Sequence, residues 1–137
     1  MGRIVLIVDD DIDDRDFFCE ALHDIDASIE CVCAKNGQDA LQLLNELTGT
    51  LPNYIFLDLN MPRLGGMQCL TALKKNKKLS NIPVIIFSTT RQNAEAEEAR
   101  QLGAVLFLTK PSNYTQLIDK LSSILSQQFL VARVDNG

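Results

Sequence analysis

Five short apolar runs, each followed by a segment with helical periodicity, constrain the fold of this chain more than any other feature. The runs are rich in β-branched and aromatic residues, and they cover residues 3–8, 28–34, 54–58, 83–88 and 104–109. Nearly every residue in each run is apolar, whereas a strand with one solvated face would alternate apolar and polar residues. Such uniform runs are typical of strands that are covered on both faces, as in a parallel sheet.

The segments between the runs carry apolar residues at helical spacing. Helices are predicted over residues 13–25, 37–47, 66–75, 91–103 and 112–130, and the last of them opens with a Ser cap. The starts of the runs are about 20 to 30 residues apart, which leaves room for one helix and two loops between strands. The order is therefore (βα)5, and right-handed crossovers predict an α/β fold with a doubly wound, five-stranded parallel sheet.

Length and charge limit the classes of protein to consider. The chain has 137 residues and is 46% hydrophobic, which suits one domain. Its formal net charge of −5 argues against a nucleic-acid partner and against docking on an anionic membrane. No apolar run approaches the roughly 20 residues of a membrane span, and the N-terminus lacks the features of a signal peptide. We expect a soluble, cytoplasmic protein.

The domain is expected to occupy residues 1–131, followed by a flexible tail over residues 132–137. No DNA-binding or catalytic output segment follows residue 131, so a stand-alone domain is predicted. The apolar residues near this end are interpreted as packing at the end of the last helix, with a homodimer contact as the alternative; they are Phe129, Leu130, Val131 and Val134.

The four cysteines form no Cys-x-x-Cys pair, and only His23 could join them as a nitrogen ligand. Their spacing does not fit a zinc site. We expect buried, reduced thiols that act as small hydrophobic side chains.

Polar side chains that can carry chemistry follow four of the predicted strands. They are Asp9 and Asp10 after the first strand, Asp58 after the third, Ser88 at the end of the fourth and Lys110 after the fifth. The carboxyl ends of parallel strands are where open α/β sheets bind ligands. The sequence therefore predicts that these side chains share one pocket.

The predicted pocket carries an excess of negative charge. Two carboxylates about 4 Å apart repel by roughly 4 kcal/mol near a protein surface, and a hard divalent cation would offset this. Carboxylates, carbonyls and water are ligands of Mg²⁺, with Mn²⁺ as the alternative. Asp13 and Asp14 are interpreted as favouring the start of the following helix. Asp11 could belong to either group, and the helix-start role is preferred for it. Nucleotide binding is disfavoured because the turn after the first strand is acidic instead of glycine-rich.

Four motifs together resemble the receiver domain of two-component response regulators. They are "LIVDDD", "FLDLNMPRLGG", "PVIIFSTT" and "FLTKPS", and the similarity covers about residues 3–128. The resemblance implies a flavodoxin-like strand order, 2-1-3-4-5. It also implies that the protein is a phosphoacceptor in a histidine–aspartate phosphorelay and signals through altered protein–protein contacts. Such a protein catalyses only its own phosphorylation and dephosphorylation and is not otherwise an enzyme.

The resemblance assigns roles to the acidic residues. Asp58 would be the phosphoacceptor. Asp10 and Asp58 would bind Mg²⁺ directly, together with the backbone carbonyl of Asn60, and Asp9 would bind it directly or through water. The phosphoryl donor would be a sensor histidine kinase or a histidine phosphotransfer protein, and a downstream protein would read the result.

The same resemblance assigns roles on the fourth and fifth strands. Lys110 would pair with a phosphoryl oxygen and Ser88 would donate a hydrogen bond to another. Ser88 and Phe107 would form the conformational switch, in which the aromatic ring turns inward behind the Ser. The Lys110–Pro111 peptide bond would be cis.

Two other classes of function stay open. A phosphatase of the haloacid dehalogenase type would use Asp9 as its nucleophile, since Asp9-x-Asp11 fits its motif superficially. A scaffold with the same fold would act without phosphorylation, although the complete acidic set argues against it. The sequence does not name the kinase, the stimulus or the downstream target.

Overall fold

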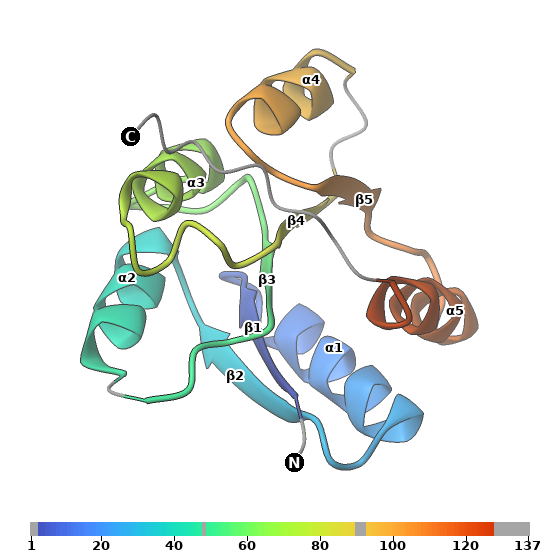
Figure 1. Ribbon diagram of the computed structural model, residues 1–137. Helices are drawn as coiled ribbons and strands as arrows, with labels where there is room; N and C mark the ends of the chain where they lie inside the picture. Colours follow the sequence, from blue (N-terminus) through green and yellow to red (C-terminus); the bar gives the residue numbers. More distant parts are fainter. Residues whose placement is uncertain (1–2, 48, 90–92, 128–137) are drawn as a thin grey trace.

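In the described part of the chain, which comprises residues 3–47, 49–89 and 93–127, strands and helices alternate as predicted. In this computed structural model the strands are β1 (Ile4–Val8), β2 (Glu30–Ala34), β3 (Tyr54–Leu57), β4 (Val84–Ser88) and β5 (Leu106–Thr109). The helices are α1 (Ile12–Ile25), α2 (Gly37–Glu46), α3 (Gly66–Lys75), α4 (Asn93–Gln101) and α5 (Tyr114–Leu125). All strand pairs are parallel and the order is β2-β1-β3-β4-β5, which confirms the predicted fold (Figure 1).

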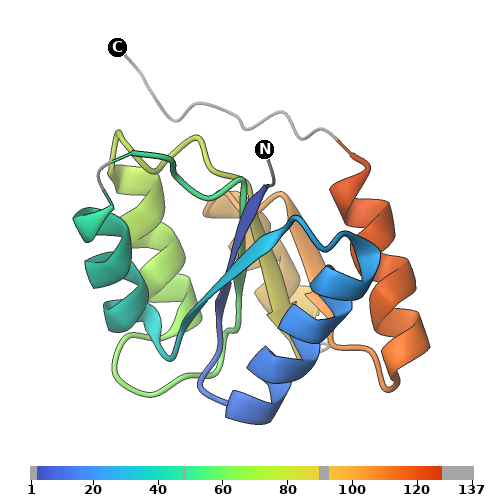
Figure 2. The same cartoon turned by 90° about the horizontal axis from the view of Figure 1, so that it is seen from below.

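Helices cover both faces of the sheet. Figure 2 shows α1 and α5 on one side of the strands, with α2 and α3 on the other. α4 lies on the side of α2 and α3, since its buried residue Ala99 belongs to the same hydrophobic cluster as Leu44 and Leu70. The strand ends therefore remain the part of the sheet that helices do not cover.

Alternate strand residues enter two separate cores. In β1, Leu6 and Val8 pack beneath α2 and α3, whereas Val5 and Ile7 pack beneath α1 and α5. This two-sided burial explains the uniformly apolar runs in the central strands. It holds only in part at the edges of the sheet, because Glu30 in β2 is exposed and the residues of β5 are half-buried.

Side-chain caps fix where three helices begin. Asp11 accepts hydrogen bonds from the backbone N–H groups of Asp13 and Asp14 at 2.9 and 3.2 Å, which confirms its predicted helix-start role. Asn36 caps α2 in the same way. α5 is capped by Asn113 and not by the predicted Ser112, because the helix begins one residue later than expected.

Two predictions concern residues outside the described part of the chain. The flexible tail over residues 132–137 and the packing or dimer role of the apolar residues from Phe129 to Val134 both lie there. In the described part, no helix combines the length and apolar character that a membrane crossing requires.

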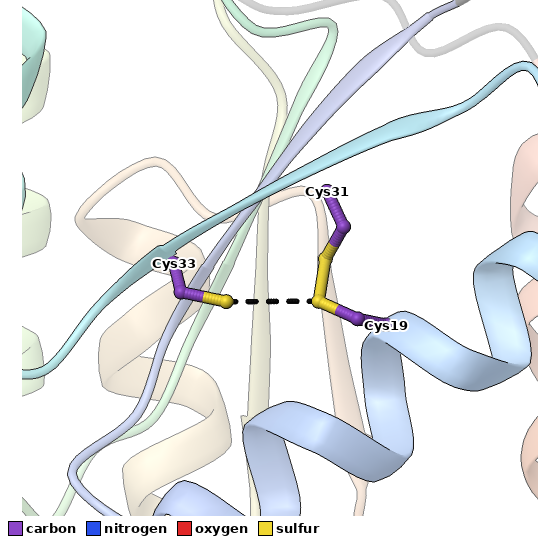
Figure 3. Close-up of a disulfide and its surroundings, with 3 residues drawn as sticks. All are labelled: Cys19, Cys31 and Cys33. Atoms are coloured by element: carbon purple, nitrogen blue, oxygen red, sulfur yellow. Dashed lines mark hydrogen bonds between the residues drawn. A yellow bond between two sulfur atoms is a disulfide. The ribbon is translucent and has the colours of Figure 1, made fainter.

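The expectation of buried, reduced thiols is wrong for part of the cysteine set. Cys19 on α1 and Cys31 on β2 form a disulfide, with their Cα atoms 5.7 Å apart (Figure 3). Cys33 is free and exposed, and only Cys69 is the buried free thiol that was expected. Burial raises the pKa of Cys69 to about 12. The disulfide depends on how α1 packs against the edge of the sheet, which spacing along the chain does not reveal.

A close backbone approach ties the start of α3 to the end of β3. The Gly66 N–H donates a hydrogen bond to the Leu59 carbonyl at 3.1 Å. A Cβ atom on Gly66 would lie 2.4 Å from the Asp58 carbonyl oxygen and 2.6 Å from the Leu59 Cα. A side chain at position 66 would therefore push apart the backbone that carries Asp58.

We predict that Gly66→Ala lowers the free energy of unfolding by about 1–3 kcal/mol, because the added methyl group collides with backbone atoms that have little room to move. Urea denaturation measures this change. Gly49→Ala is the matched control, since a Cβ atom there meets nothing within 4 Å. Equal stability of the two variants would contradict the packing described for Gly66.

Candidate functional site

The predicted strand-end residues converge at one edge of the sheet. Asp9 and Asp10 follow β1, and Asp58 follows β3, which pairs directly with β1. One carboxylate oxygen from each of these three residues lies within 4.8 Å of the others. Asp9 and Asp58 are buried, whereas Asp10 is exposed at the rim. The parallel topology thus creates an acidic cluster from Asp58 and two residues that precede it by 48 and 49 positions, as the sequence numbers show.

Lys110 brings the end of β5 to this cluster. Its Nζ lies 2.7 Å from Asp9 Oδ2, 2.7 Å from Asp14 Oδ2 and 3.8 Å from Asp58 Oδ2. Burial alone would lower the pKa of Lys110, but the bonds to Asp14 and Asp9 and the charge of Asp58 outweigh it and raise that pKa. Lys110 is therefore a permanent positive charge among three carboxylates.

Residues of α1 complete the site in a way that the sequence prediction missed. Asp14 was assigned to the helix start, but its carboxylate pairs with Lys110 across the cluster. Arg15 Nη1 donates to the Asp9 carbonyl at 2.6 Å. The signal that could have found Asp14 is its place in the first turn of a helix that begins at the strand edge, so that its side chain can reach the neighbouring strand ends.

The two carboxylate oxygens of Asp9 have different partners: one accepts a hydrogen bond, and the other forms an ion pair without one. Oδ1 accepts a hydrogen bond from the Asp11 backbone N–H at 3.0 Å, and Oδ2 pairs with Lys110. The side chain is 1% exposed. These contacts therefore fix the position of the Asp9 side chain within the cluster.

Asp58 is fixed mainly through its backbone. Its N–H donates to the Val8 carbonyl at 3.0 Å, and its Oδ1 accepts the Asn60 N–H at 3.4 Å. Burial raises the pKa of Asp58 above its usual value. Lys110 opposes this rise, Asp9 adds to it, and the hydrogen bonds from Asn60 and Ser88 oppose it. The unfavourable desolvation of this carboxylate leaves it in need of a positive partner.

The two predicted switch residues, Ser88 and Phe107, lie on the neighbouring strands β4 and β5. Ser88 is fully buried, and its carbonyl accepts a hydrogen bond from the Lys110 N–H at 2.9 Å. Phe107 is half-buried on β5 and lines a cavity of about 280 Å³ between α4 and β5. The structure thus places free volume beside the predicted switch residue, and the switch itself stays a prediction.

The predicted cis bond between Lys110 and Pro111 is wrong. The described chain contains no cis peptide bond, so this bond is trans. The trans isomer is the lower in energy for an X-Pro bond, by about 0.5–1 kcal/mol.

The donor set fits a hard divalent cation. Three carboxylates within 4.8 Å of one another offer oxygen ligands only, and no thiol or imidazole takes part in this cluster. Mg²⁺ and Mn²⁺ prefer oxygen ligands, and Mg²⁺ typically uses one or two carboxylates together with water. The exposed Asp10 and Asn60 leave one side open to solvent. The carbonyl of Asn60, predicted as a further ligand, stays a prediction.

Comparisons with known proteins agree on one family. The family model described as the response regulator receiver domain matches residues 5–122. The response regulator Rcp1 of Synechocystis sp. is 27% identical over 128 residues, which cover 90% of this chain and 87% of that protein. A crystal structure of the Mn²⁺-bound form of Rcp1 superposes with a TM-score of 0.83 at 26% identity, covering 96% of this chain and 100% of the other.

Some relatives are much longer than this chain. A protein-glutamate methylesterase/protein-glutamine glutaminase of Methanococcoides burtonii is 38% identical over 134 residues, which cover 96% of this chain and 34% of the relative. The chain thus spans about a third of that protein's length.

The raised pKa of Asp58 predicts how stability depends on pH in metal-free protein. The folded state holds the Asp58 proton more tightly than the unfolded state, so this stabilisation is full at low pH. It is lost as the pH rises through the usual carboxyl range toward the raised pKa. We expect Asp58→Asn, which does not titrate, to become increasingly more stable than the natural protein over this range.

Urea denaturation in the presence of a chelator, at a series of pH values, measures this difference. Asp119→Asn on α5 is the control for loss of one exposed carboxylate. A stability difference between Asp58→Asn and the natural protein that shrinks with rising pH would contradict the assignment.

Proposed function

The chain belongs to the response regulator receiver domain family, and on this premise we propose that Asp58 accepts a phosphoryl group from the phosphohistidine of a sensor kinase or phosphotransfer protein. The observation that carries the proposal is the convergence of Asp58 with Asp9 and Lys110 at one edge of the sheet. A nucleophile, a metal-binding acid and a fixed cation are the parts that phosphoryl transfer needs.

The proposed chemistry requires positioning and charge neutralisation more than proton transfer. A carboxylate oxygen of Asp58 attacks phosphorus while the bond from phosphorus to the histidine nitrogen breaks, and the freed imidazole takes a proton from solvent. Lys110 pairs with one phosphoryl oxygen and Ser88 donates a hydrogen bond to another. For this step Lys110, whose Nζ lies 2.7 Å from Asp9 Oδ2, exchanges part of its pairing with Asp9 for the incoming group.

A divalent cation supplies the remaining positive charge when bound. Mg²⁺ fits the donor set best, with Asp10 and Asp58 as direct ligands, the Asn60 carbonyl as a third, and Asp9 direct or through water. The Mn²⁺-bound structure of Rcp1 supports divalent-metal binding in a related receiver domain. Here the cation would reduce the repulsion among the carboxylates and between them and the phosphoryl oxygens.

The geometry favours Asp58 over Asp9 as the nucleophile. Both carboxylate oxygens of Asp9 are already engaged, one by a backbone N–H and one by Lys110. Asp58 Oδ2 is 3.8 Å from Lys110 Nζ, so it is paired less tightly with this ammonium group than Asp9 is. This argues against the haloacid dehalogenase mechanism, which would phosphorylate Asp9, and the intact acidic cluster argues against a phosphorylation-independent scaffold.

We propose that the signal passed to other proteins follows from the charge that phosphorylation adds to Asp58. We further propose that the protein acts in the cytoplasm, with neither nucleic acid nor a membrane as its partner. Phosphorylation brings about −1.5 to −2 units of charge and three acceptor oxygens. Ser88 would move toward the phosphoryl group, and Phe107, which lines the cavity between α4 and β5, would turn inward behind it. A downstream protein, or a second copy of the chain, would recognise the changed surface.

We predict that a small acyl phosphate with Mg²⁺ phosphorylates the natural protein at Asp58 and leaves Asp58→Asn unmodified. Lys110→Ala should slow the reaction by about 10²-fold, since it removes one preorganised charge from the transferring group. Intact-mass measurement, with peptide mapping after reductive trapping of the acyl phosphate, locates the site.

Asp26→Asn is the control for loss of one carboxylate away from the site, because Asp26 is the C-cap residue at the far end of α1, and it should be phosphorylated like the natural protein. Phosphate found on Asp9 together with turnover of the donor would overturn the proposal in favour of the phosphatase. Unaltered partner binding and self-association after phosphorylation of Asp58 would favour the scaffold.

We predict that Mg²⁺ at 100 times its dissociation constant raises the free energy of unfolding by about 2.7 kcal/mol. Asp10→Asn removes an exposed ligand that does not pair with Lys110, and a tenfold loss of affinity would reduce this gain to about 1.4 kcal/mol. Urea denaturation with and without Mg²⁺ measures both values. The full gain in Asp10→Asn would contradict the proposed ligand set, and Asp119→Asn should retain that gain.

A further inference from the structure

A second cluster of metal-ligating side chains lies at the edge of the sheet, apart from the acidic residues. The Sγ atoms of Cys19, Cys31 and Cys33 all lie within 4.8 Å of one another, and Cys33 Sγ is 3.6 Å from Cys19 Sγ (Figure 3). Cys31 and Cys33 are two positions apart on β2, so both side chains point to the same face of the strand. α1 covers that face and contributes Cys19.

The three sulfur atoms form a triangle. To attack Cys19 Sγ and release Cys31, the Cys33 sulfur would have to lie in line with the sulfur–sulfur bond. With Cys33 Sγ 3.6 Å from Cys19 Sγ and a sulfur–sulfur bond of about 2 Å, Cys33 Sγ would then be about 5.6 Å from Cys31 Sγ. The limit of 4.8 Å on all sulfur pairs excludes that line. The arrangement is therefore poorly suited to an exchange in which Cys33 replaces Cys31 as the disulfide partner of Cys19.

A triangle of sulfur atoms suits a metal ion better. Zinc–sulfur bonds are about 2.3 Å long, so thiolates around one ion lie about 3.8–4.0 Å apart. Cys33 is already close to this distance from Cys19. Reduction of the disulfide would let the Cys19 and Cys31 sulfurs separate to the same spacing without moving their Cα atoms, which are 5.7 Å apart.

We propose that, when the Cys19–Cys31 disulfide is reduced, Cys19, Cys31 and Cys33 bind one thiophilic cation such as Zn²⁺ or Cu⁺. Thiolates select such soft ions over Mg²⁺, which the acidic cluster would keep. The bound ion replaces the disulfide as a link between α1 and the edge strand β2. This inference goes beyond the proposed function and does not depend on it.

The chemistry balances with a dithiol as reductant. The dithiol supplies two electrons and two protons to the sulfur–sulfur bond, which breaks to give the thiols of Cys19 and Cys31, and the dithiol itself becomes a disulfide. Metal binding then displaces the thiol protons to solvent.

Access to the Cys33 sulfur permits binding. Cys33 is exposed on an edge strand, so an ion and a water molecule that completes its coordination can reach the sulfurs. Arg15 and Asp16 both act electrostatically on Cys33. Burial raises the pKa of the Cys33 thiol, and the charges of Arg15 and Asp16 shift that pKa in opposite directions, so the proton that Cys33 loses must be displaced by the metal ion.

The sequence prediction of no zinc site rested on the spacing of the cysteines along the chain, whereas the three sulfur atoms come together only in the folded protein. Two ligands come from alternate positions of one strand and the third from a helix that packs on it. Zinc motifs read from sequence place ligand pairs on one loop, which this arrangement does not use.

The test uses Co²⁺ as a spectroscopic substitute for zinc, with excess Mg²⁺ present to occupy the acidic cluster. The full chain is reduced with a dithiol, freed of it without oxygen, and titrated. We expect one equivalent of Co²⁺ to bind with thiolate-to-metal charge-transfer absorption, and Zn²⁺ to displace it. The disulfide form should show no such absorption.

Three variants make the test specific. Cys33→Ser and Cys19→Ser should each weaken binding by more than about tenfold, and Cys69→Ala should leave it unchanged because Cys69 is buried elsewhere. Absence of charge-transfer absorption in the reduced natural protein would overturn the proposal. So would unchanged Co²⁺ affinity in Cys33→Ser, or the same absorption in the disulfide form.

Discussion

The attraction between one buried ammonium group and several carboxylates is the interaction on which the candidate site depends. Asp9 and Asp58 are both buried, and burial of a carboxylate is unfavourable unless a positive charge accompanies it. Lys110 provides that charge from the opposite end of the sequence, with Nζ 2.7 Å from Asp9 and 2.7 Å from Asp14. The pairing connects the end of β5 to the end of β1 and to the first turn of α1.

One ammonium group does not neutralise the cluster, and this imbalance accounts for the proposed chemistry. Burial raises the pKa of Asp58 despite the opposing effect of Lys110, so the protein alone leaves this carboxylate electrostatically unsatisfied. A divalent cation would supply the missing charge, and a phosphoryl group would then enter a site whose positive partners are already in place. Rigidity comes from the backbone: Asp58 is bonded to Val8, and Gly66 permits the close packing of α3 beneath it.

The features that the sequence predicted are those that follow from periodicity and parallel topology. Uniform apolar runs predicted the strands, and the strand order then brought Asp9, Asp58 and Lys110 together. The features that it missed depend on how helices turn and pack. The reach of Asp14 to Lys110 and the approach of Cys19 to Cys31 both require the position of α1, which no local pattern specifies. The trans bond before Pro111 was missed because the prediction followed the family instead of the lower-energy isomer.

The central claim is that these distant residues form one site that takes up a phosphoryl group at Asp58. A crystal structure of the protein with Mg²⁺ and beryllofluoride, a mimic of the phosphoryl group, tests it most directly. The account predicts beryllium joined to a carboxylate oxygen of Asp58, with Lys110 paired to a fluorine and Mg²⁺ held by Asp10 and Asp58. Beryllium joined to Asp9, or no adduct at saturating beryllofluoride, would contradict it.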